Sequence, residues 1–323
     1  MSLSDLPREI LLDVADYLGD TGMNALARTN SQVYHLLNRL LYRRDITKPE
    51  SESLIWGAEY GVEGTIQQAI DDGQNLTPIS KSFQTALQVA IDSHQEYARL
   101  VELLLQVDDI NPGNHLLGTA ASRGHVNIFK LLLDYPDTDP NFAERDGRTA
   151  LMRAYKPEVV KVLLEQADIE INRQDDLGCT ALSHAAHHSY SNSNGSSSSD
   201  IEIAKLLLER EDIDANLPES NGWTALHWAC HNGCLALVDL LLEKDIDPNS
   251  RDNLGRTPLA HVCHYSCGSV AIVRSLLSHP STDPNAINNN GVSILVDHTT
   301  SKASGFISPN NEIESLLRAA GAT

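Results

Sequence analysis

Short clusters of leucine separated by polar turns recur along most of this chain. The clusters lie at residues 103–105, 131–133, 163–164, 206–208, 240–242, 276–277 and 316–317. A Val precedes several clusters by three or four residues, as Val238 precedes Leu241, and this spacing places both side chains on one helical stripe. We therefore predict a series of short amphipathic helices that bury their leucines against one another.

A polar turn of fixed length separates these helices in five places. Each copy has an Asn, a Gly six residues later, a Thr or Ser two places after the Gly, and an apolar residue two places further on. The Asn/Gly pairs are Asn141/Gly147, Asn172/Gly178, Asn216/Gly222, Asn249/Gly255 and Asn285/Gly291. Gly permits a turned backbone, and the hydroxyl of Thr is expected to cap the helix that follows. Recurrence at about 30 to 45 residues is typical of stacked repeat proteins, which usually bind partners.

The repeated unit resembles the ankyrin repeat, and the fullest copy is Gly222-Trp-Thr-Ala-Leu-His-Trp-Ala-Cys-His-Asn-Gly233 followed by Asp247-Pro-Asn249. The resemblance covers residues 53–323 as about eight units. It implies an all-α ankyrin-repeat solenoid with short β-turn fingers. We expect a shortened first helix near Tyr155 and a degenerate last unit. The Ser-rich insertion at 189–200 is expected to be a flexible loop.

Residues 1–48 lack this turn and predict a three-helix domain. Leu6, Ile10, Val14 and Leu18 share one helical stripe, and Pro7 suits the first turn of that helix. With Leu37 in the third helix, the segment resembles an F-box. The resemblance implies docking on the Skp-type adaptor of a cullin ubiquitin ligase through Leu6, Pro7, Ile10 and Leu37. The alternative is that these helices only cap the repeat array.

Charge and cysteine usage limit the partners and the compartment. The 323 residues carry a net charge of −20, and the excess of acidic residues lies after residue 48. An acidic surface repels phosphate groups, so we expect neither nucleic acid nor a membrane as the partner. Five cysteines without a hydrophobic leader or an 18-residue apolar run predict reduced thiols in the cytoplasm or nucleus. We also expect the chain to be monomeric before assembly.

The sequence disfavours two kinds of chemistry, zinc binding and catalysis. Cys230 with Cys234, and Cys263 with Cys267, have a spacing close to that of zinc ligands, but Cys230 and Cys263 also fall at a small apolar position of the repeat. We favour packing for them and expect no metal or other cofactor. The chain lacks the sequence motifs of a nucleophile elbow, a zinc protease and a nucleotide-binding loop, so we do not expect an enzyme.

The resemblance implies that target-binding residues lie on a concave face formed by the fingers and the ends of the first helices. The positions that it assigns are Arg123, Arg145, Asp146, Arg148, His187, His188, Trp223, His231, Asn232, Asn253, Arg256, His264 and Tyr265. Trp, Tyr and Arg are common in binding hot spots. We expect Trp223 to contact a target, the alternative being partial burial on a neighbouring finger, and we expect Trp228 to be core.

His187, His231 and His264 recur at one helix position and predict a ladder that gains positive charge below about pH 6.5. Together, the two resemblances imply a substrate receptor of an SCF-type ubiquitin ligase. The alternative is a scaffold or inhibitor with no ligase connection.

Overall fold

The computed structural model describes residues 52–73, 79–107, 110, 112–188, 198–244, 246–264, 269–303 and 311–323. The predicted domain at 1–48, Tyr265, and residues 189–197 of the predicted insertion lie outside this part of the chain. The described residues are helical and form no sheet; a single bridge joins Ile287 and Ser293. None of the helices in the described ranges is long and apolar enough to span a membrane. The chain divides into two compact units, Met1–Asp139 and Pro140–Thr323.

Three helix pairs form the described part of the first unit. They are α3 (Glu52–Glu59) with α4 (Glu63–Gly73), α5 (Ile79–Asp92) with α6 (Ala98–Leu105), and α7 (His115–Arg123) with α8 (Val126–Leu133). α3, α5 and α7 contact one another in sequence, as do α4, α6 and α8, so the pairs stack as two rows. Phe83 and Phe129 are the largest fully buried side chains in this stack.

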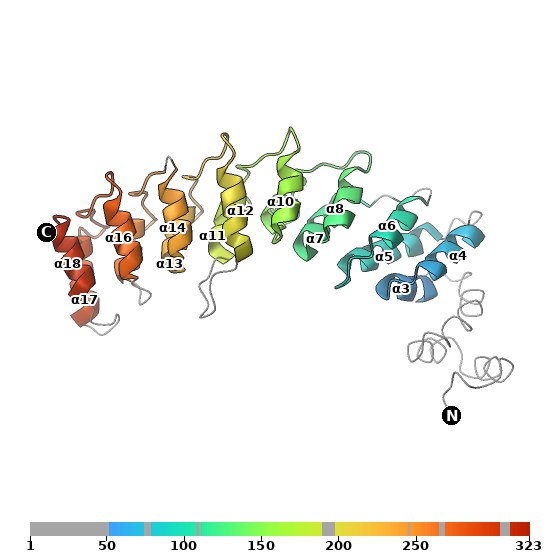
Figure 1. The fold of residues 1–323 in the computed structure, drawn as a ribbon, viewed down its shortest axis with the longest axis horizontal. Helices are drawn as coiled ribbons and strands as arrows, with labels where there is room; N and C mark the ends of the chain where they lie inside the picture. Colours follow the sequence, from blue (N-terminus) through green and yellow to red (C-terminus); the bar gives the residue numbers. More distant parts are fainter. Residues whose placement is uncertain are drawn as a thin grey trace, which may run out of the picture. The chain divides into compact units, whose positions relative to one another are not determined.

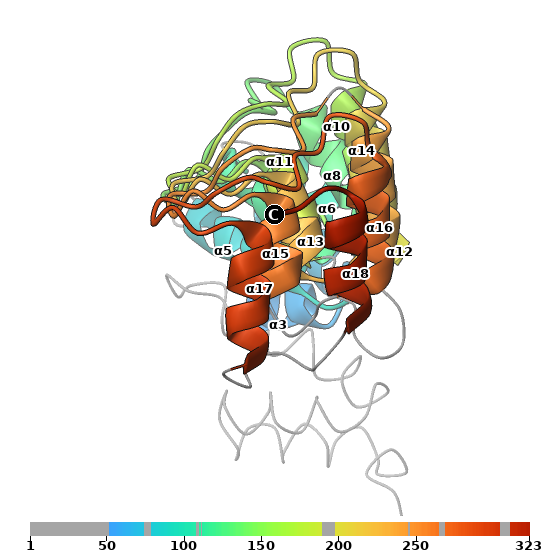
Figure 2. The same ribbon diagram turned by 90° about the vertical axis from the view of Figure 1, so that its left-hand side faces the viewer.

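Five further helix pairs form the second unit. They are α9 (Ala150–Arg153) with α10 (Pro157–Leu164), α11 (Ala181–His188) with α12 (Ser198–Leu208), α13 (Ala225–His231) with α14 (Leu235–Leu242), α15 (Pro258–His264) with α16 (Val270–Ser278), and α17 (Ile294–Ala303) with α18 (Asn311–Ala319). The first helices of the pairs form one row and the second helices another, side by side in Figures 1 and 2. The leucine stripes fill the space between the rows, with Leu163, Leu207, Leu241 and Leu276 fully buried.

Local sequence explains two departures in helix length. α9 has only four residues because Ala154 takes an extended conformation and Pro157 starts the next helix, so the predicted shortening near Tyr155 is confirmed. The predicted insertion at 189–200 extends too far, because its last three residues belong to α12, which begins at Ser198. Asp200 lies in the first turn of this helix, where a negative charge is favoured by the helix dipole.

Each pair in the second unit is preceded by a finger, a tight turn centred on the repeated Gly (Figure 2). The five finger glycines all have positive φ, from 73° at Gly291 to 83° at Gly222, a conformation that side chains with a Cβ rarely adopt. Space is a second constraint, because a Cβ on Gly222 would lie 2.8 Å from the backbone N of Asn253 in the next finger. Backbone bonds join adjacent fingers, as from the Asn253 N–H to the carbonyl of Asn221 at 2.9 Å.

The repeated Asn of each finger hydrogen-bonds to the turn that follows the helix pair of its own repeat. The Nδ2 of Asn141 donates to the carbonyl of Asp168, and its Oδ1 accepts from the N–H of Glu170, both at 2.8 Å. Asn172, Asn249 and Asn285 make both corresponding backbone bonds, Asn285 with the C-terminal residues Gly321 and Thr323, and Oδ1 of Asn216 accepts from the N–H of Asp247. An amide that donates and accepts at once explains why this position is Asn in every copy.

The Thr after each finger caps its helix only in part of the array. The hydroxyl of Thr180 accepts from the N–H of Ser183 at 3.1 Å, and that of Thr257 accepts from Ala260 at 3.3 Å, which confirms the prediction there. The hydroxyl of Thr224 lies 3.0 Å from Nδ1 of His227, whereas Thr149 makes no side-chain capping bond.

Candidate functional site

A carboxylate clamp joins four of the five fingers in the second unit to the helix that follows. The acidic residue three places before the finger Gly accepts from a side chain six places after it. The pairs are Glu144 with Arg153 at 2.8 Å, Asp175 with His184 at 2.9 Å, Glu219 with Trp228 at 2.6 Å, and Asp252 with His261 at 3.0 Å. Sequence reasoning missed the clamp, although an acid nine residues before a hydrogen-bond donor recurs in all four units.

Burial makes the histidine clamps neutral. Burial, followed by the nearby charges of His227 and Arg256, lowers the pKa of His261 to about 3. Burial alone raises the pKa of Asp252, but hydrogen bonds from the Arg256 N–H, from His261 and from the Arg256 side chain outweigh it and lower the value to about 2. Near pH 7, His261 is therefore a neutral donor to an ionised carboxylate.

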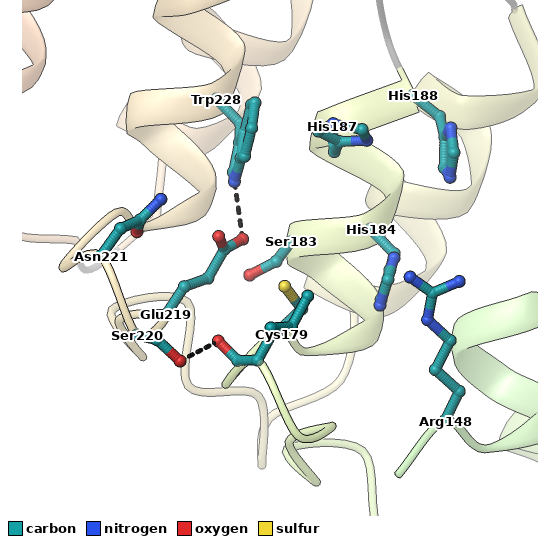
Figure 3. Close-up of a pocket in the computed structure, with 11 residues that line it drawn as sticks. Arg148, Cys179, Ser183, His184, His187, His188, Glu219, Ser220, Asn221 and Trp228 are labelled. Carbon is teal, nitrogen blue, oxygen red and sulfur yellow. Dashed lines mark hydrogen bonds between the residues drawn. The ribbon is translucent and has the colours of Figure 1, made fainter. Parts of the chain in front are cut away.

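A pocket of about 360 Å³ opens between the fingers at Gly178 and Gly222 (Figure 3). α11 and α13 supply its helical walls and the two fingers supply its floor. Its lining consists of Arg148, Leu177, Cys179, Ser183, His184, His187, His188, Glu219, Ser220, Asn221 and Trp228. The mixture of aromatic, carboxylate and hydroxyl groups in a concave space is typical of a binding site.

Glu219 is the most buried charged group at this pocket, with 9% of its surface exposed. One carboxylate oxygen accepts from the indole N–H of Trp228, and Cys179 and Ser183 line the pocket with it. Burial raises the pKa of Glu219, although the bond from Trp228 lowers it in part. Among the described residues, Glu219 forms no ion pair.

Aromatic rings from three helices and one finger pack together next to the pocket. The ring centroids of Trp228 and His187 are 4.3 Å apart, and those of Trp228 and Trp223 are 4.5 Å apart. Trp223 also lies 5.1 Å from His231 and 4.6 Å from His261. Trp223 is thus half-buried on its neighbours while keeping an exposed part. The prediction that Trp228 is core is wrong, because this side chain is half-buried and lines the pocket.

The other predicted target-binding residues fall into three groups. Exposed side chains are Arg145, Asp146, His187, His188 and Asn253. Partly exposed ones are engaged in ion pairs: Arg148 lies 3.6 Å from Asp146 and from Asp175, and Arg256 lies 2.9 Å from Asp252. Arg123, in the first unit, lies 3.1 Å from Asp92. The contact of these residues with a target stays a prediction.

Asn232 does not have the predicted position on the target-facing surface. Its side chain is buried, and its Nδ2 donates to the carbonyls of Ala186 and His187 at 3.0 and 2.9 Å. The Asn232 amide therefore joins the end of α13 to the end of α11. The prediction that Asn232 faces a target is therefore wrong.

Of the three residues in the predicted histidine ladder, two lie near each other and the third has other partners. His187 and His231 both flank the tryptophans, whereas Nδ1 of His264 lies 3.0 Å from a carboxylate oxygen of Asp297 and 3.3 Å from Ser301. Burial lowers the pKa of His187 and of His231. The expectation that the ladder charges below about pH 6.5 therefore needs correction, because these two rings gain their protons at lower pH.

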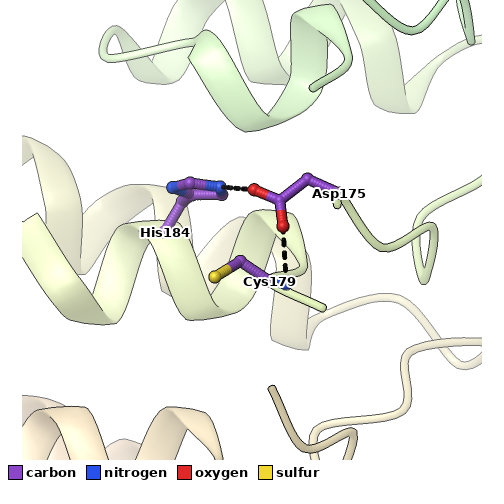
Figure 4. Close-up of side chains that lie close together, drawn as sticks. All are labelled: Asp175, Cys179 and His184. Atoms are coloured by element: carbon purple, nitrogen blue, oxygen red, sulfur yellow. Dashed lines mark hydrogen bonds and ion pairs between the residues drawn. The ribbon is translucent and has the colours of Figure 1, made fainter. Parts of the chain in front are cut away.

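One group of side chains among the described residues could hold a metal ion. Asp175, Cys179 and His184 bring their ligand atoms within 4.8 Å of one another (Figure 4). Burial, followed by the charges of Glu219 and Asp175, raises the pKa of the Cys179 thiol to about 12, which disfavours the thiolate that binds metals. The clamp at Asp252 and His261 has the same carboxylate-imidazole bond without a cysteine, so clamp geometry accounts for Asp175 and His184 here.

The cysteines considered as zinc ligands are packing residues where the structure describes them. Cys230 and Cys263 are buried in α13 and α15, as the repeat position predicted, and Cys234 is buried beside α14. Cys267 lies outside the described residues. Burial, followed by the charge of Asp297, raises the pKa of the Cys263 thiol to about 12.

Known proteins agree with this architecture. The family described as ankyrin repeats in three copies matches residues 95–175, 117–195, 156–252 and 194–288, which together cover more than half of the chain. No curated protein matches the chain closely enough to count as a relative. An ankyrin repeat domain from Acinetobacter baumannii AYE aligns over 65% of this chain and 100% of its own, with 25% identity and a TM-score of 0.54.

A second solved ankyrin repeat protein aligns over 65% of this chain and 99% of its own, with 21% identity and a TM-score of 0.54, and shows the same fold. Ankyrin repeats are protein-binding modules and are typically non-catalytic. The leucine rows, the finger turns and the family match lead to one conclusion: the chain belongs to the ankyrin-repeat family.

Proposed function

We propose that this chain is a substrate receptor of an SCF-type cullin ubiquitin ligase. In this role, residues 1–48 dock a Skp-type adaptor through Leu6, Pro7, Ile10 and Leu37, and the repeats hold the protein to be ubiquitinated. Support for the adaptor is the F-box-like pattern of the sequence, which lies outside the described residues. The role places the chain in the cytoplasm or nucleus.

The observation that carries target binding is the aromatic cluster beside the pocket. We define the finger face as the pocket lining together with Trp223 and His231. Half-exposed tryptophans next to a concave space with a buried carboxylate supply both apolar area and a directional polar group. Such combinations dominate the free energy of protein–protein binding.

Co-purification from cells tests both halves of the proposal. Three chains are compared with the full-length protein: one lacking residues 1–48, one with Trp223→Ala, and one with His187→Ser and His188→Ser, which alters only exposed side chains. Lys205→Ser, an exposed change on α12 in the other helix row, is the matched control. Proteins bound to each chain are identified by mass spectrometry.

We expect the truncated chain to lose the Skp-type adaptor and keep the target, and the finger-face variants to lose the target and keep the adaptor. Removal of one hot-spot side chain weakens binding by roughly tenfold or more. Equal adaptor capture by the truncated and full-length chains would refute docking through residues 1–48. Absence of the adaptor from the full-length sample would leave a scaffold without a ligase connection. Equal target capture by the finger-face variants and by Lys205→Ser would refute target binding at this face.

A further inference from the structure

The residue after a finger Gly can neutralise the carboxylate of the next finger. Arg148 follows Gly147, and its Nε lies 3.6 Å from Oδ2 of Asp175 in the next finger. Cys179 follows Gly178 in the same way and lines the pocket together with Glu219 of its next finger. The thiol thus occupies the position from which an arginine neutralises the carboxylate one repeat earlier.

The other clamp carboxylates each have an arginine within ion-pair distance. Glu144 has Arg153 at 2.8 Å, Asp175 has Arg148 at 3.6 Å, and Asp252 has Arg256 at 2.9 Å. Glu219 differs, because it accepts from the neutral indole N–H of Trp228, and Cys179 and Ser183 beside it in the pocket are neutral as well. A buried carboxylate without a cation binds a positive group strongly when one is supplied, because water does not screen the pair.

The small side chain of Cys179 is also the reason for the open space. At the equivalent position of the following finger, Trp223 fills the volume against His261 and Trp228. Cys179 is much smaller, and the pocket of about 360 Å³ lies there, with Cys179 and Glu219 both in its lining. Figure 3 shows Arg148 beside His184, on the opposite side of the view from Glu219, where Asp175 balances its charge.

We propose that this pocket takes an arginine side chain of the bound protein, whose guanidinium pairs with Glu219 in place of the internal arginine of the neighbouring repeat. This inference rests on the proposed role of the finger face in target binding. The planar guanidinium donates to the carboxylate and stacks against the rings of Trp228 and His187. A net charge of −20 on the chain also favours a basic segment.

The test uses the full chain and the peptide acetyl-Gly-Arg-Gly-amide. The control peptide carries citrulline, which has the shape of arginine without its charge. Binding is followed by NMR through the indole N–H resonance of Trp228, which donates to Glu219 and therefore reports on this carboxylate. Glu219→Gln keeps an oxygen that can accept from Trp228 and removes the charge. Cys179→Arg supplies the guanidinium from within the chain. Glu243→Gln, at an exposed carboxylate, is the matched control.

We expect the arginine peptide, and not the citrulline peptide, to shift the Trp228 resonance. Glu219→Gln should weaken the binding roughly tenfold to hundredfold, as for a lost charge-assisted bond. Cys179→Arg should abolish binding and raise the melting temperature, which separates loss of the site from loss of folding. Glu243→Gln should bind like the unaltered chain.

Equal binding of the two peptides, or unchanged binding in Cys179→Arg, would overturn the arginine pocket. The two proposals fail in different ways. If the arginine peptide does not bind while target capture still depends on Trp223, only the arginine pocket is refuted. If target capture does not depend on the finger-face side chains, the proposed binding of a target at this face is refuted.

Discussion

The fingers around Glu144 and Asp252 perform the same task with carboxylates of different length. Both clamp the following helix, at 2.8 Å from Arg153 and 3.0 Å from His261. Asp252 also accepts from the N–H groups of Leu254 and Arg256 within its own finger, at 2.9 and 2.8 Å. The short side chain of Asp252 thus closes the turn and also binds the following helix, whereas the side chain of Glu144 only binds the helix.

The finger with the longer carboxylate closes its turn with another residue. Oδ1 of Asp146, one place before the Gly, accepts from the N–H of Arg148 at 3.2 Å. Glu219 shows the same arrangement, because Asn221 accepts from the N–H of Trp223 at 2.7 Å. Asp175 belongs to the other type and accepts from Leu177 and Cys179 at 2.9 Å each. Two side-chain solutions therefore produce one backbone turn.

The largest expected effect on stability follows from a difference in burial, because the Asp252 carboxylate is buried and the Glu144 carboxylate is partly exposed. Asp252→Ala leaves His261 and the finger N–H groups without their acceptor and leaves Arg256 without its ion pair, so it should lower the free energy of unfolding by about 3–5 kcal/mol. Glu144→Ala removes a partly exposed pair and should cost about 1 kcal/mol or less. Urea unfolding followed by circular dichroism measures both, and equal losses would contradict the comparison.

A second expected effect depends on pH. The pKa of His261 is about 3 in the folded chain and near 6.5 when unfolded, so below pH 6.5 the unfolded chain binds a proton that the folded chain does not. Stability should therefore fall between pH 6.5 and about 3. Asp252, with a pKa of about 2 against 3.8 unfolded, adds a loss between about pH 4 and 2.

His261→Gln tests this origin, because Gln still donates to Asp252 and cannot titrate. Between pH 6 and 5, the fall in unfolding free energy should be smaller in the variant by up to about 1.4 kcal/mol per pH unit. Part of the fall should remain, because burial lowers the pKa of His227 to about 4 and this residue still titrates. Urea unfolding at several pH values measures the slope, and identical slopes in both chains would assign the effect to other groups.

Features that depend on backbone geometry could be predicted from the sequence. Features that depend on which side chain occupies a position in each repeat could not. The helices follow from the leucine stripes, and the fingers follow from the Asn and Gly that their bonds and positive φ require. The clamp was missed because its donor changes from Arg153 to His184 to Trp228 to His261, so no single residue type marks the position. The pocket was missed because it depends on Cys179 being smaller than the residues at the equivalent position of the two adjacent fingers.

The smallest expected effect comes from converting one finger type into the other. Asp252→Glu should keep the bond to His261 but lose the two finger N–H bonds, lowering the free energy of unfolding by about 1–2 kcal/mol. Adding Leu254→Asp places a short carboxylate where Asp146 stands in the Glu144 finger, and Leu254 is exposed, so this change removes no core contact. The double variant should recover most of the loss in urea unfolding. Leu254→Asp alone should change stability by less than about 0.5 kcal/mol, as is usual for an exposed site. A double variant no more stable than Asp252→Glu would mean that the two finger types are not interchangeable solutions of one turn.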